Sequence, residues 1–412
     1  MLTRKLNSLK LLHANHGMTG VLSFLWSRYI SGTHPQARGR IDVFNIYDYL
    51  NFKQFGDQVS FDADDACVIN WLILGLLVGS GGHINTLRLI YNLEQRGYKC
   101  RIILTGGFSD YSSTEEAKRK IRENFFPLDA EVSFGASSLK PAKITVATSW
   151  LTAYAARNFK GTQHRCYFVQ DYEPHFYPHG SEYYFAEATY RMGFYGITAG
   201  NWLAHKLATE YGMQTTSMGF SYDRELYRPH TRLSFKIKQV FFYARPVTER
   251  RGFELGLLAL NRVAQQLPDV EFILAGWDAS TYYIPFKHKN AGSVAVKDLA
   301  KLYSQCDVAL VLSMTNLSLL PLELMACGCP VVSNNGANVE WLLNDSNAVL
   351  ADPTPEALGD AIISLLQDDD KRMQLAEDGL KFAATTSWDV ETSKVADFFE
   401  QLMADEKVGE GL

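Results

Sequence analysis

The sequence contains no apolar run long enough to cross a membrane. A bilayer-spanning helix needs roughly 20 consecutive apolar residues. The best run here, Cys67–Gly79, is shorter, is interrupted by Asn70 and ends in glycines. We interpret it as a buried strand region. No secretory signal is recognisable either, so the sequence predicts a cytoplasmic protein.

Cysteine is scarce, with six among 412 residues. The six lie mostly in apolar segments, which is typical of buried free thiols in a reducing compartment. Cys327 and Cys329 are too close for a zinc knuckle, and no matching Cys/His pair follows them. His175 and His179 have the spacing of a helical metal pair, but Pro178 breaks the helix that this ligation requires. We predict no metal site.

Acidic residues are absent from the first forty positions, which hold six Lys and Arg, although the whole chain has a net charge of −5. The overall charge argues against nucleic acid as a partner. The basic segment allows two interpretations. One is an amphipathic helix on the inner membrane surface. The other is a helical extension packed on its own domain, and the uneven apolar spacing favours it.

Two ligand-binding motifs are incomplete. Gly79-Ser-Gly-Gly-His83 follows a strand and opens a helix, as a phosphate loop does. Ile84 stands at the third glycine position, however, and no acid closes a strand about twenty residues later, so NAD binding is not expected. Asp62-Ala-Asp64 is a DxD pattern, which holds a metal-bound nucleotide in some enzymes. Because it precedes its strand, we interpret it as an acidic turn.

What the chain does contain is one repeated theme: an apolar strand, a polar loop and an amphipathic helix. This pattern predicts parallel sheets of βα units, and the length favours two domains facing a cleft. We expect a basic extension over 1–40 and Rossmann-like doubly wound domains over 41–222 and 223–388, with a linker near 215–235. Strands are expected at 71–78, 100–104, 144–147, 165–169, 196–199 (the last of the first half), 238–244, 270–275 and 307–312, and after Gly328.

The segment Leu310–Ser333 predicts a nucleotide diphosphate ligand. It has the pattern of a buried strand, a polar loop, a short helix from near Pro321, a glycine stop at Gly328 and a second strand. The unpaired N–H groups and the dipole at such a helix N-terminus attract an anion. Glu323, in the first turn, is placed to bind the hydroxyls of a ribose.

Charged and polar residues follow two other strands. Arg245 ends one, and Arg251 follows six residues later, so two guanidinium groups are available to neutralise a diphosphate. Gln170 and Asp171 follow the strand at 165–169, and Tyr172 begins a short aromatic segment. Such a group suits the hydroxyls and rings of sugars. A turn-capping role for Asp171 is an equally good interpretation of the local sequence.

Together these pieces resemble the retaining family 4 glycosyltransferases of the GT-B fold. The family's Gly-Arg and Lys-Gly pair corresponds to Ala244-Arg245 and Arg251-Gly252, and its Glu-x7-Glu motif falls on 315–323. Its Ala-Cys-Gly-x-Pro-Val-Val matches 326–332. Ser387-Trp-Asp389 matches the Trp-Asp before a final helix, here 389–412, that crosses back to the first domain. The segment Phe168–Pro174 is most similar to dTDP-rhamnose-dependent rhamnosyltransferases of S-layer and O-antigen type glycans.

This resemblance implies a division of labour between the domains. The C-terminal domain would bind dTDP-β-L-rhamnose, with catalytic help from Arg245, Arg251 and Asp171. The acceptor saccharide, whether or not lipid-linked, would lie on the N-terminal domain. No metal or other cofactor would be needed. The resemblance assigns nucleotide-sugar binding to Glu323, Thr315, Asn316, Ser318, Leu319, Leu320, Val294 and Gly276, and acceptor binding to Gly81, Gly82, Gln170 and Tyr172.

Two departures from the family pattern leave alternatives open. Thr315 replaces the first Glu of the motif, which in the family faces the donor sugar; a 6-deoxy sugar would suit this less polar residue. Gln170 replaces a His, which removes a titratable group and shifts attention to Asp171. The alternatives are a family 4 transferase that uses another UDP- or GDP-sugar, a nucleotide-sugar 2-epimerase, and a catalytically inactive glycan-binding module.

Overall fold

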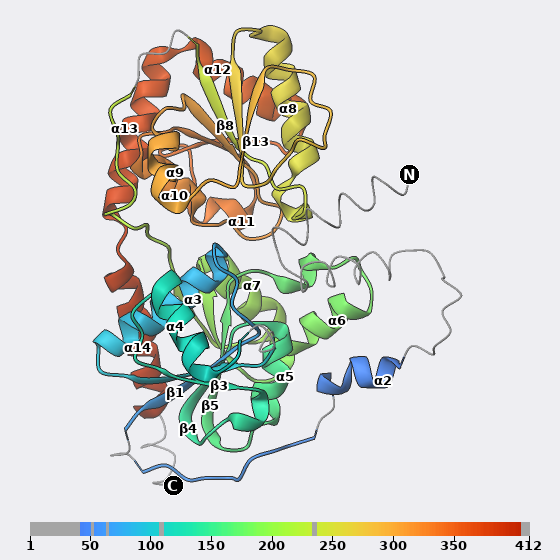
Figure 1. Cartoon of the computed structure of the whole chain (residues 1–412), viewed down its shortest axis with the longest axis vertical. Coiled ribbons are helices and arrows are strands. Elements are labelled where there is room, and N and C mark those ends of the chain that lie inside the picture. The colour runs from blue at the N-terminus through green and yellow to red at the C-terminus, as the bar shows by residue number, and fades with distance from the viewer. Residues whose placement is uncertain (1–41, 51–52, 63–65, 107–110, 233–236, 405–412) are drawn as a thin grey trace.

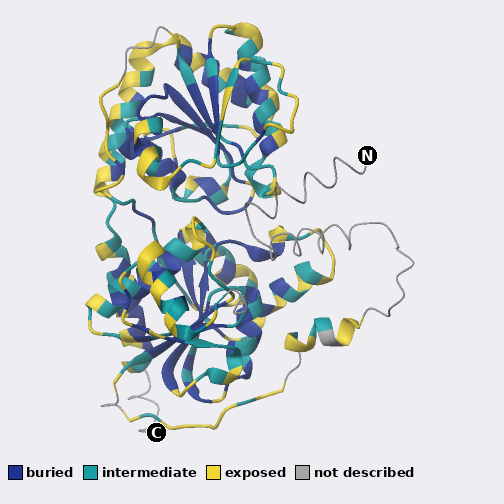
Figure 2. Ribbon diagram, in the orientation of Figure 1, coloured by how far each residue is buried: buried dark blue, intermediate teal, exposed yellow. Residues whose placement is uncertain are grey.

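The computed structural model describes residues 42–50, 53–62, 66–106, 111–232 and 237–404. The basic segment at 1–40 and most of the DxD pattern at 62–65 lie outside the described residues. Figure 1 shows two domains, with the N-terminal domain below and the C-terminal domain above. In both, the strands are buried and the helices expose their outer sides (Figure 2).

The N-terminal domain is built on a seven-stranded sheet whose order is β3-β2-β1-β4-β5-β6-β7. Every neighbouring pair is parallel. Its central strands are buried along almost their whole length, which is the pattern of a sheet covered by helices on both faces. The strands are β1 (Val68–Ile73), β2 (Lys99–Leu104), β3 (Glu131–Phe134), β4 (Ala142–Ala147), β5 (Thr162–Val169), β6 (Tyr195–Ala199) and β7 (Thr215–Met218).

Helices connect these strands and cover the sheet. Ser149 begins α5 with a capping box, in which the Ser149 side chain and Thr152 satisfy each other's backbone groups. Gly200 and Gly212 bound α7 at its two ends, both with positive φ. The helices are α2 (Val43–Ile46), α3 (Gly81–Gln95), α4 (Thr114–Asn124), α5 (Trp150–Asn158), α6 (Ser181–Ala188) and α7 (Asn201–Tyr211), with short 3-10 helices at Asp48–Leu50, Ala136–Ser138, Glu173–Phe176 and Thr189–Arg191.

The C-terminal domain has a six-stranded parallel sheet in the order β10-β9-β8-β11-β12-β13. The strands are β8 (Gln239–Tyr243), β9 (Glu271–Ala275), β10 (His288–Gly292), β11 (Val308–Val311), β12 (Val331–Asn334) and β13 (Val349–Ala351). The helices are α8 (Phe253–Gln266), α9 (Val296–Tyr303), α10 (Leu320–Ala326), α11 (Ala337–Glu340), α12 (Pro355–Gln367) and α13 (Asp369–Thr385), and a 3-10 helix spans Glu249–Arg251.

The last helix, α14 (Trp388–Ala404), returns to the N-terminal domain along the edge of the molecule (Figure 1). Phe398, Phe399 and Leu402 are buried in the core that β1, β2 and α3 also form. Arg96 donates to Asp389 over 2.6 Å. The chain therefore begins and ends its described structure in the same domain.

The predicted fold class is confirmed, since both halves are doubly wound parallel α/β domains. Two details of the prediction are wrong, and it also omits the strands β3, β10 and β13. The strand expected at 71–78 is β1 at Val68–Ile73, and Leu77 and Val78 are 44% and 62% exposed beyond it. The strand at 196–199 is not the last of its sheet, because β7 follows within the segment expected to be a linker. Hydrophobicity alone does not show where a strand leaves its sheet.

All six cysteines are free thiols, and all but the partly buried Cys67 are buried, as predicted. Among the described residues, no helix combines the length and hydropathy of a membrane span. No group of three His, Cys, Asp or Glu side chains in the described chain is arranged to hold a metal ion.

Candidate functional site

The carboxylate of Asp171 joins the two domains. Asp171 follows β5 at the carboxyl edge of the first sheet, where ligands of doubly wound domains usually bind. Its Oδ1 accepts from the backbone N–H of Asn316 at 2.8 Å, and its Oδ2 accepts from the Thr315 hydroxyl at 2.9 Å. Oδ1 also accepts from the N–H of Tyr172 at 2.9 Å. The buried acid of one domain is thus bound by the loop before α10 of the other.

Asn316 completes this connection with its side chain. Its Nδ2 donates to the backbone oxygens of Gln170 and Ala199, at 2.9 and 2.8 Å. Its Oδ1 accepts from the indole N–H of Trp341 at 2.8 Å and from the N–H of Leu317 at 3.0 Å. All the hydrogen-bonding capacity of this amide is used. In this conformation Asn316 connects the domains and has no group left for a sugar hydroxyl.

Trp341 lies against the N-terminal domain at Gly200. A Cβ atom placed on Gly200 would lie 2.5 Å from the Trp341 ring. Phe220 packs on the same indole edge to face, with ring centroids 5.3 Å apart. Gly200 also has a φ of 85°, a conformation that favours glycine. The contact therefore requires glycine for both space and backbone geometry.

Three arginines approach this junction from the loop after β8. Arg250 Nε lies 3.6 Å from Asp171 Oδ2, and its guanidinium stacks on Phe176 at 4.2 Å. Arg251 donates to the Ser313 hydroxyl at 2.9 Å and to the Asn316 carbonyl at 3.3 Å. Arg245 donates to the Thr248 and Tyr243 hydroxyls, which fixes it at the end of β8.

Charge and burial oppose each other at this centre. Burial raises the pKa of Asp171, while Arg250, Arg251 and the bonds from Asn316 and Thr315 lower it. Burial likewise lowers the pKa of Arg250 and of Arg251, and the Asp171 carboxylate raises both. Two guanidinium groups against one carboxylate leave an excess of positive charge. The arrangement suits a further anion, such as a phosphate group.

Two residues after Asp171, Glu173 is a second buried acid. Its Oε1 accepts from the Tyr167 hydroxyl at 2.5 Å, and its Oε2 accepts from the N–H of Trp150 at 2.9 Å. Its own N–H donates to Tyr190, whose hydroxyl also reaches the Asp171 carbonyl. Burial raises the pKa of Glu173 to about 7. Glu173 therefore anchors the segment that carries Asp171.

Changing Glu173 to Gln should make stability less dependent on pH. A buried acid with a raised pKa stabilises the fold fully below its unfolded value of 4.5 and loses that contribution as pH rises through about 7. The wild type should therefore lose on the order of 3 kcal/mol relative to the variant between pH 4.5 and 8. Denaturation of both proteins across this range measures the difference.

The exposed Glu254, changed to Gln in the same way, is the control for the removal of one carboxylate charge at the surface. Glu323 also has a pKa raised to about 7 by burial. Because it is present in both proteins, its contribution cancels in the comparison. A difference between wild type and Glu173→Gln that does not change with pH would contradict the prediction.

The predicted acceptor residues divide into two groups. Gln170 and Gly82 come together, because Gln170 Nε2 donates to the Gly82 carbonyl at 3.0 Å and also to Thr86 at 3.1 Å. Gly81 begins α3, with open space where a side chain would lie. Tyr172 is less accessible than these residues, because it is 2% exposed and its hydroxyl is hydrogen-bonded to that of Tyr211. Its ring packs against those of His175 and Tyr190.

The predicted ribose acid belongs to α10 of the C-terminal domain. Glu323 is in the first turn of α10, which begins at Leu320, one residue before the expected position. Burial raises its pKa to about 7, whereas the Tyr227 hydroxyl and the Arg88 guanidinium lower it. Arg88 comes from α3 of the N-terminal domain, so Glu323 also faces the junction. Ser318 and Leu319 are partly buried in the loop before α10.

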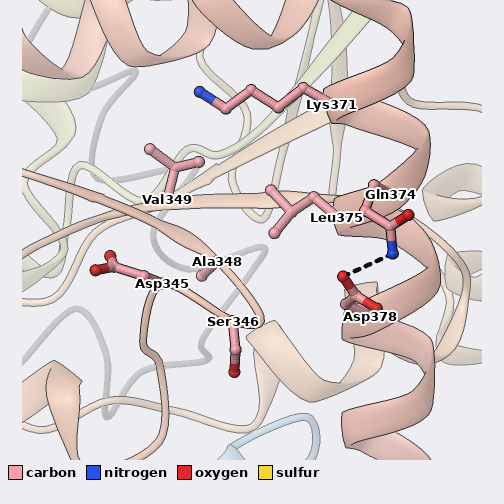
Figure 3. Close-up of a pocket in the computed structure, with 8 residues that line it drawn as sticks. All are labelled: Asp345, Ser346, Ala348, Val349, Lys371, Gln374, Leu375 and Asp378. Carbon is pink, nitrogen blue, oxygen red and sulfur yellow. Dashed lines mark hydrogen bonds between the residues drawn. The ribbon is translucent and has the colours of Figure 1, made fainter.

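The remaining predicted residues lie at the C-terminal sheet. A Cβ atom on Gly276 would lie 2.5 Å from the ring of Tyr243, so this glycine leaves room for that ring. Val294 is partly buried against the core that α9 and α10 share. Two surface cavities lie elsewhere. One, of about 580 Å³, is lined by Asp345, Lys371 and neighbours on α13 (Figure 3). The other, of about 610 Å³, is lined by Tyr49 and Phe55 among others.

Sequence reasoning missed four residues of the junction: Arg250, Glu173, Trp341 and Gly200. Arg250 was overlooked because its neighbour Arg251 occupies the motif position. Glu173 was visible as an acid two residues after Asp171, but its burial was not. Nothing in the local sequence marks Trp341 or Gly200, because their importance comes from contact between distant segments.

Comparison with protein families gives two matches. Residues 79–201 match the family described as WsaF, N-terminal domain, and residues 238–363 match WsaF, C-terminal domain. The matches follow the order of the family's own domains and together cover more than half of the chain. They include Asp171 in the first domain and Arg250, Thr315 and Asn316 in the second.

A curated relative is the O-antigen biosynthesis protein RfbC of Myxococcus xanthus, which is 36% identical over 264 residues. The match covers 63% of this chain but 21% of RfbC, so this chain corresponds to only about a fifth of that protein.

Solved structures share the fold. Sucrose-phosphate synthase from Thermosynechococcus elongatus has a TM-score of 0.64 at 16% identity and covers 82% of this chain and 100% of its own. HepE from Anabaena, solved in complex with UDP-glucose, has a TM-score of 0.60 at 18% identity, covering 81% and 99% of the two chains. The expected arrangement of two parallel-sheet domains, the GT-B fold, is therefore confirmed.

Proposed function

We propose that this chain, a protein of GT-B fold that matches both WsaF domains, is a glycosyltransferase acting in the assembly of a surface glycan. The family matches and the similarity to an O-antigen biosynthesis protein support the class of reaction and the pathway. The observation that carries the proposal is the cationic centre at Asp171, where Arg250 and Arg251 meet a carboxylate between two domains.

In its specific form, the proposal is transfer of L-rhamnose from dTDP-β-L-rhamnose to a saccharide with retention of anomeric configuration. The rhamnosyltransferase resemblance of Phe168–Pro174 supports the donor. Arg250 supports the handling of its diphosphate, since the buried Nε of this side chain has no hydrogen-bond partner among the described residues. A phosphate oxygen would supply one. Glu323 would accept bonds from the ribose hydroxyls.

The reaction can then be written with its atoms balanced. The bond between the anomeric carbon and the diphosphate oxygen breaks, and positive charge develops on the sugar ring while negative charge develops on the leaving group. Arg250 and Arg251 stabilise the leaving diphosphate electrostatically. The acceptor oxygen attacks from the face that the diphosphate leaves, and a phosphate oxygen takes its proton. Asp171 holds Arg250 in place and stabilises the positive sugar ring.

We propose that the enzyme needs no metal ion, because no step in this scheme uses one. Contact between the domains serves a separate purpose, because closing the site excludes water that would otherwise hydrolyse the donor. The hydrogen bonds from Thr315 and Asn316 to Asp171 belong to this closed arrangement.

Donor kinetics test the function directly. With a saccharide acceptor and EDTA present, dTDP-β-L-rhamnose should give kcat/KM at least about a hundredfold above UDP-glucose. A site built for a sugar methyl leaves the additional hydroxyl of glucose without partners, and the different base adds to this discrimination. Release of dTDP that depends on acceptor is the measurement. Equal use of UDP-glucose would refute the rhamnose donor, and activity restored by manganese would refute metal independence.

A further inference from the structure

Four side-chain rings form a continuous group at the surface of the N-terminal domain. They belong to His175, His179, Tyr183 and Tyr184, on the 3-10 helix Glu173–Phe176, on α6 and on the turn between them. We call them the ring cluster. The His179 centroid lies 4.6 Å from that of Tyr183 and 5.1 Å from that of Tyr184. His175 and Tyr183 are 6.4 Å apart. Figure 1 places α6 at the side of its domain.

The ring cluster is continuous with the Asp171 centre. The His175 ring packs on the buried Tyr172 ring, with centroids 4.6 Å apart, and Tyr172 follows Asp171 in the chain. Phe176, the residue after His175, stacks its ring on the guanidinium of Arg250. A molecule whose reacting atom lies near Arg250 would therefore reach the ring cluster with its next portion.

We propose that the ring cluster binds a pyranose ring of the acceptor saccharide, next to the sugar unit that receives the transferred residue. This inference rests on the proposed function and deepens it. The faces of these rings are apolar and match the C–H groups of a pyranose. Their edges carry two phenol hydroxyls and four imidazole nitrogens, which match sugar hydroxyls. No aliphatic side chain belongs to the cluster.

Exposure favours a ligand of this size. Tyr184 is 53% exposed, both histidines are exposed and Tyr183 is partly buried. A stable protein interface buries about 800 Å² on each partner and is centred on well-packed anchors. Four rings are too few for such an interface, but they are enough to bind one or two sugar units. A protein partner is therefore the less suitable occupant.

The base of the ring cluster is rigid, which favours weak ligands such as sugars. Glu173 and Pro174 are buried directly before His175, and Glu173 is held by Tyr167, Trp150 and Tyr190. The Tyr184 hydroxyl lies 3.4 Å from His179 Nε2, so a hydrogen bond also links these two rings. Binding to a preorganised surface costs little ordering entropy.

The test is a double variant, His179→Ala with Tyr184→Ala, on the full chain. The probes are p-nitrophenyl glycosides of disaccharides built from L-rhamnose, D-glucose, D-galactose, D-mannose or N-acetyl-D-glucosamine, so that a second pyranose can reach the ring cluster while the first accepts the transferred sugar. Their KM as acceptors should rise about tenfold in the variant, since aromatic contacts of this kind contribute modestly but additively. The KM for the donor and the rate of donor hydrolysis without acceptor should stay within about twofold of wild type.

Tyr283→Ala is the matched control, because Tyr283 is 90% exposed on the other domain. A Tyr184→Phe variant, which keeps the ring and His179, should retain most of the acceptor affinity of the wild type. Saturation-transfer NMR with the same glycosides measures binding without turnover, so the inference remains testable if the proposed activity fails. It would be overturned by a double variant that binds and uses the glycosides as the control does. It would also be overturned by a wild type that binds none of them.

Discussion

Changing Asp171 to Asn should lower the rate of sugar transfer by about a hundred- to a thousandfold, the range found when one preorganised electrostatic group is removed from an active site. Asparagine has nearly the same shape, so Oδ1 can still accept from Asn316 and Nδ2 can donate to the Thr315 hydroxyl. What disappears is the negative charge beside Arg250. The fold should therefore survive while the charge balance of the centre does not.

Steady-state kinetics, with donor affinity measured by calorimetry, check this result. The donor dissociation constant should change by less than about fivefold, because Asp171 acts mainly on the charge that develops during reaction. Asp360→Asn is the control, since Asp360 forms an exposed ion pair with Arg262 at 2.8 Å, and it should retain full activity. Unchanged turnover in Asp171→Asn would leave the carboxylate with a structural role only.

The substitution Gly200→Ala should also lower catalytic activity strongly, because it adds a methyl group at the contact between the domains. The Cβ atom of Gly200→Ala would lie 2.5 Å from the Trp341 ring, so the indole must move away from the N-terminal domain. That movement would break its bond to Asn316 and with it the alignment of Asp171 against Thr315. We expect kcat/KM to fall by about a hundredfold, as misplacement by about 1 Å does in other sites.

Gly135→Ala provides a matched control within the same domain. Gly135 has φ 77° and ψ 146°, close to the φ of 85° and ψ of 159° of Gly200, but the nearest atom to its Cβ position is Ser137 Oγ at 3.7 Å, an ordinary van der Waals contact. Both variants carry the strain of an alanine in a backbone region that favours glycine, about 1–3 kcal/mol. Only Gly200→Ala also separates the domains, which small-angle scattering can detect. Equal loss of activity in both variants would contradict the proposed contact.

The structure explains, without reference to the donor sugar, why Thr315 stands where the resembled motif has Glu. The family 4 pattern that the sequence resembles has Glu at this position, and a Glu here would place a second carboxylate against Asp171. Two buried carboxylates in contact repel each other, and one would have to take up a proton. The hydroxyl of Thr315 donates to Asp171 instead, at 2.9 Å. Thr315 therefore permits direct contact between the domains.

The fold was largely predictable from the sequence, and the strands that were missed share one cause. The four strands that the hydrophobic pattern failed to predict are β3, β7, β10 and β13, which are the four edges of the two sheets. An edge strand has one neighbour and an exposed side, so it needs no continuous apolar run. The interior strands are buried on both faces, and their hydrophobicity made them visible.

The site was predictable only as separate parts. Local sequence placed Asp171 after a strand, two arginines after another and the Thr315–Glu323 motif across the start of a helix, because short-range patterns determine strands, loops and helix ends. Only the tertiary structure decided that Asp171 meets Thr315 and Asn316, more than 140 positions away. It also decided that Arg250 faces the carboxylate and that Tyr172 is covered. Such pairings depend on how two sheets pack against each other, and that packing is a property of the whole chain.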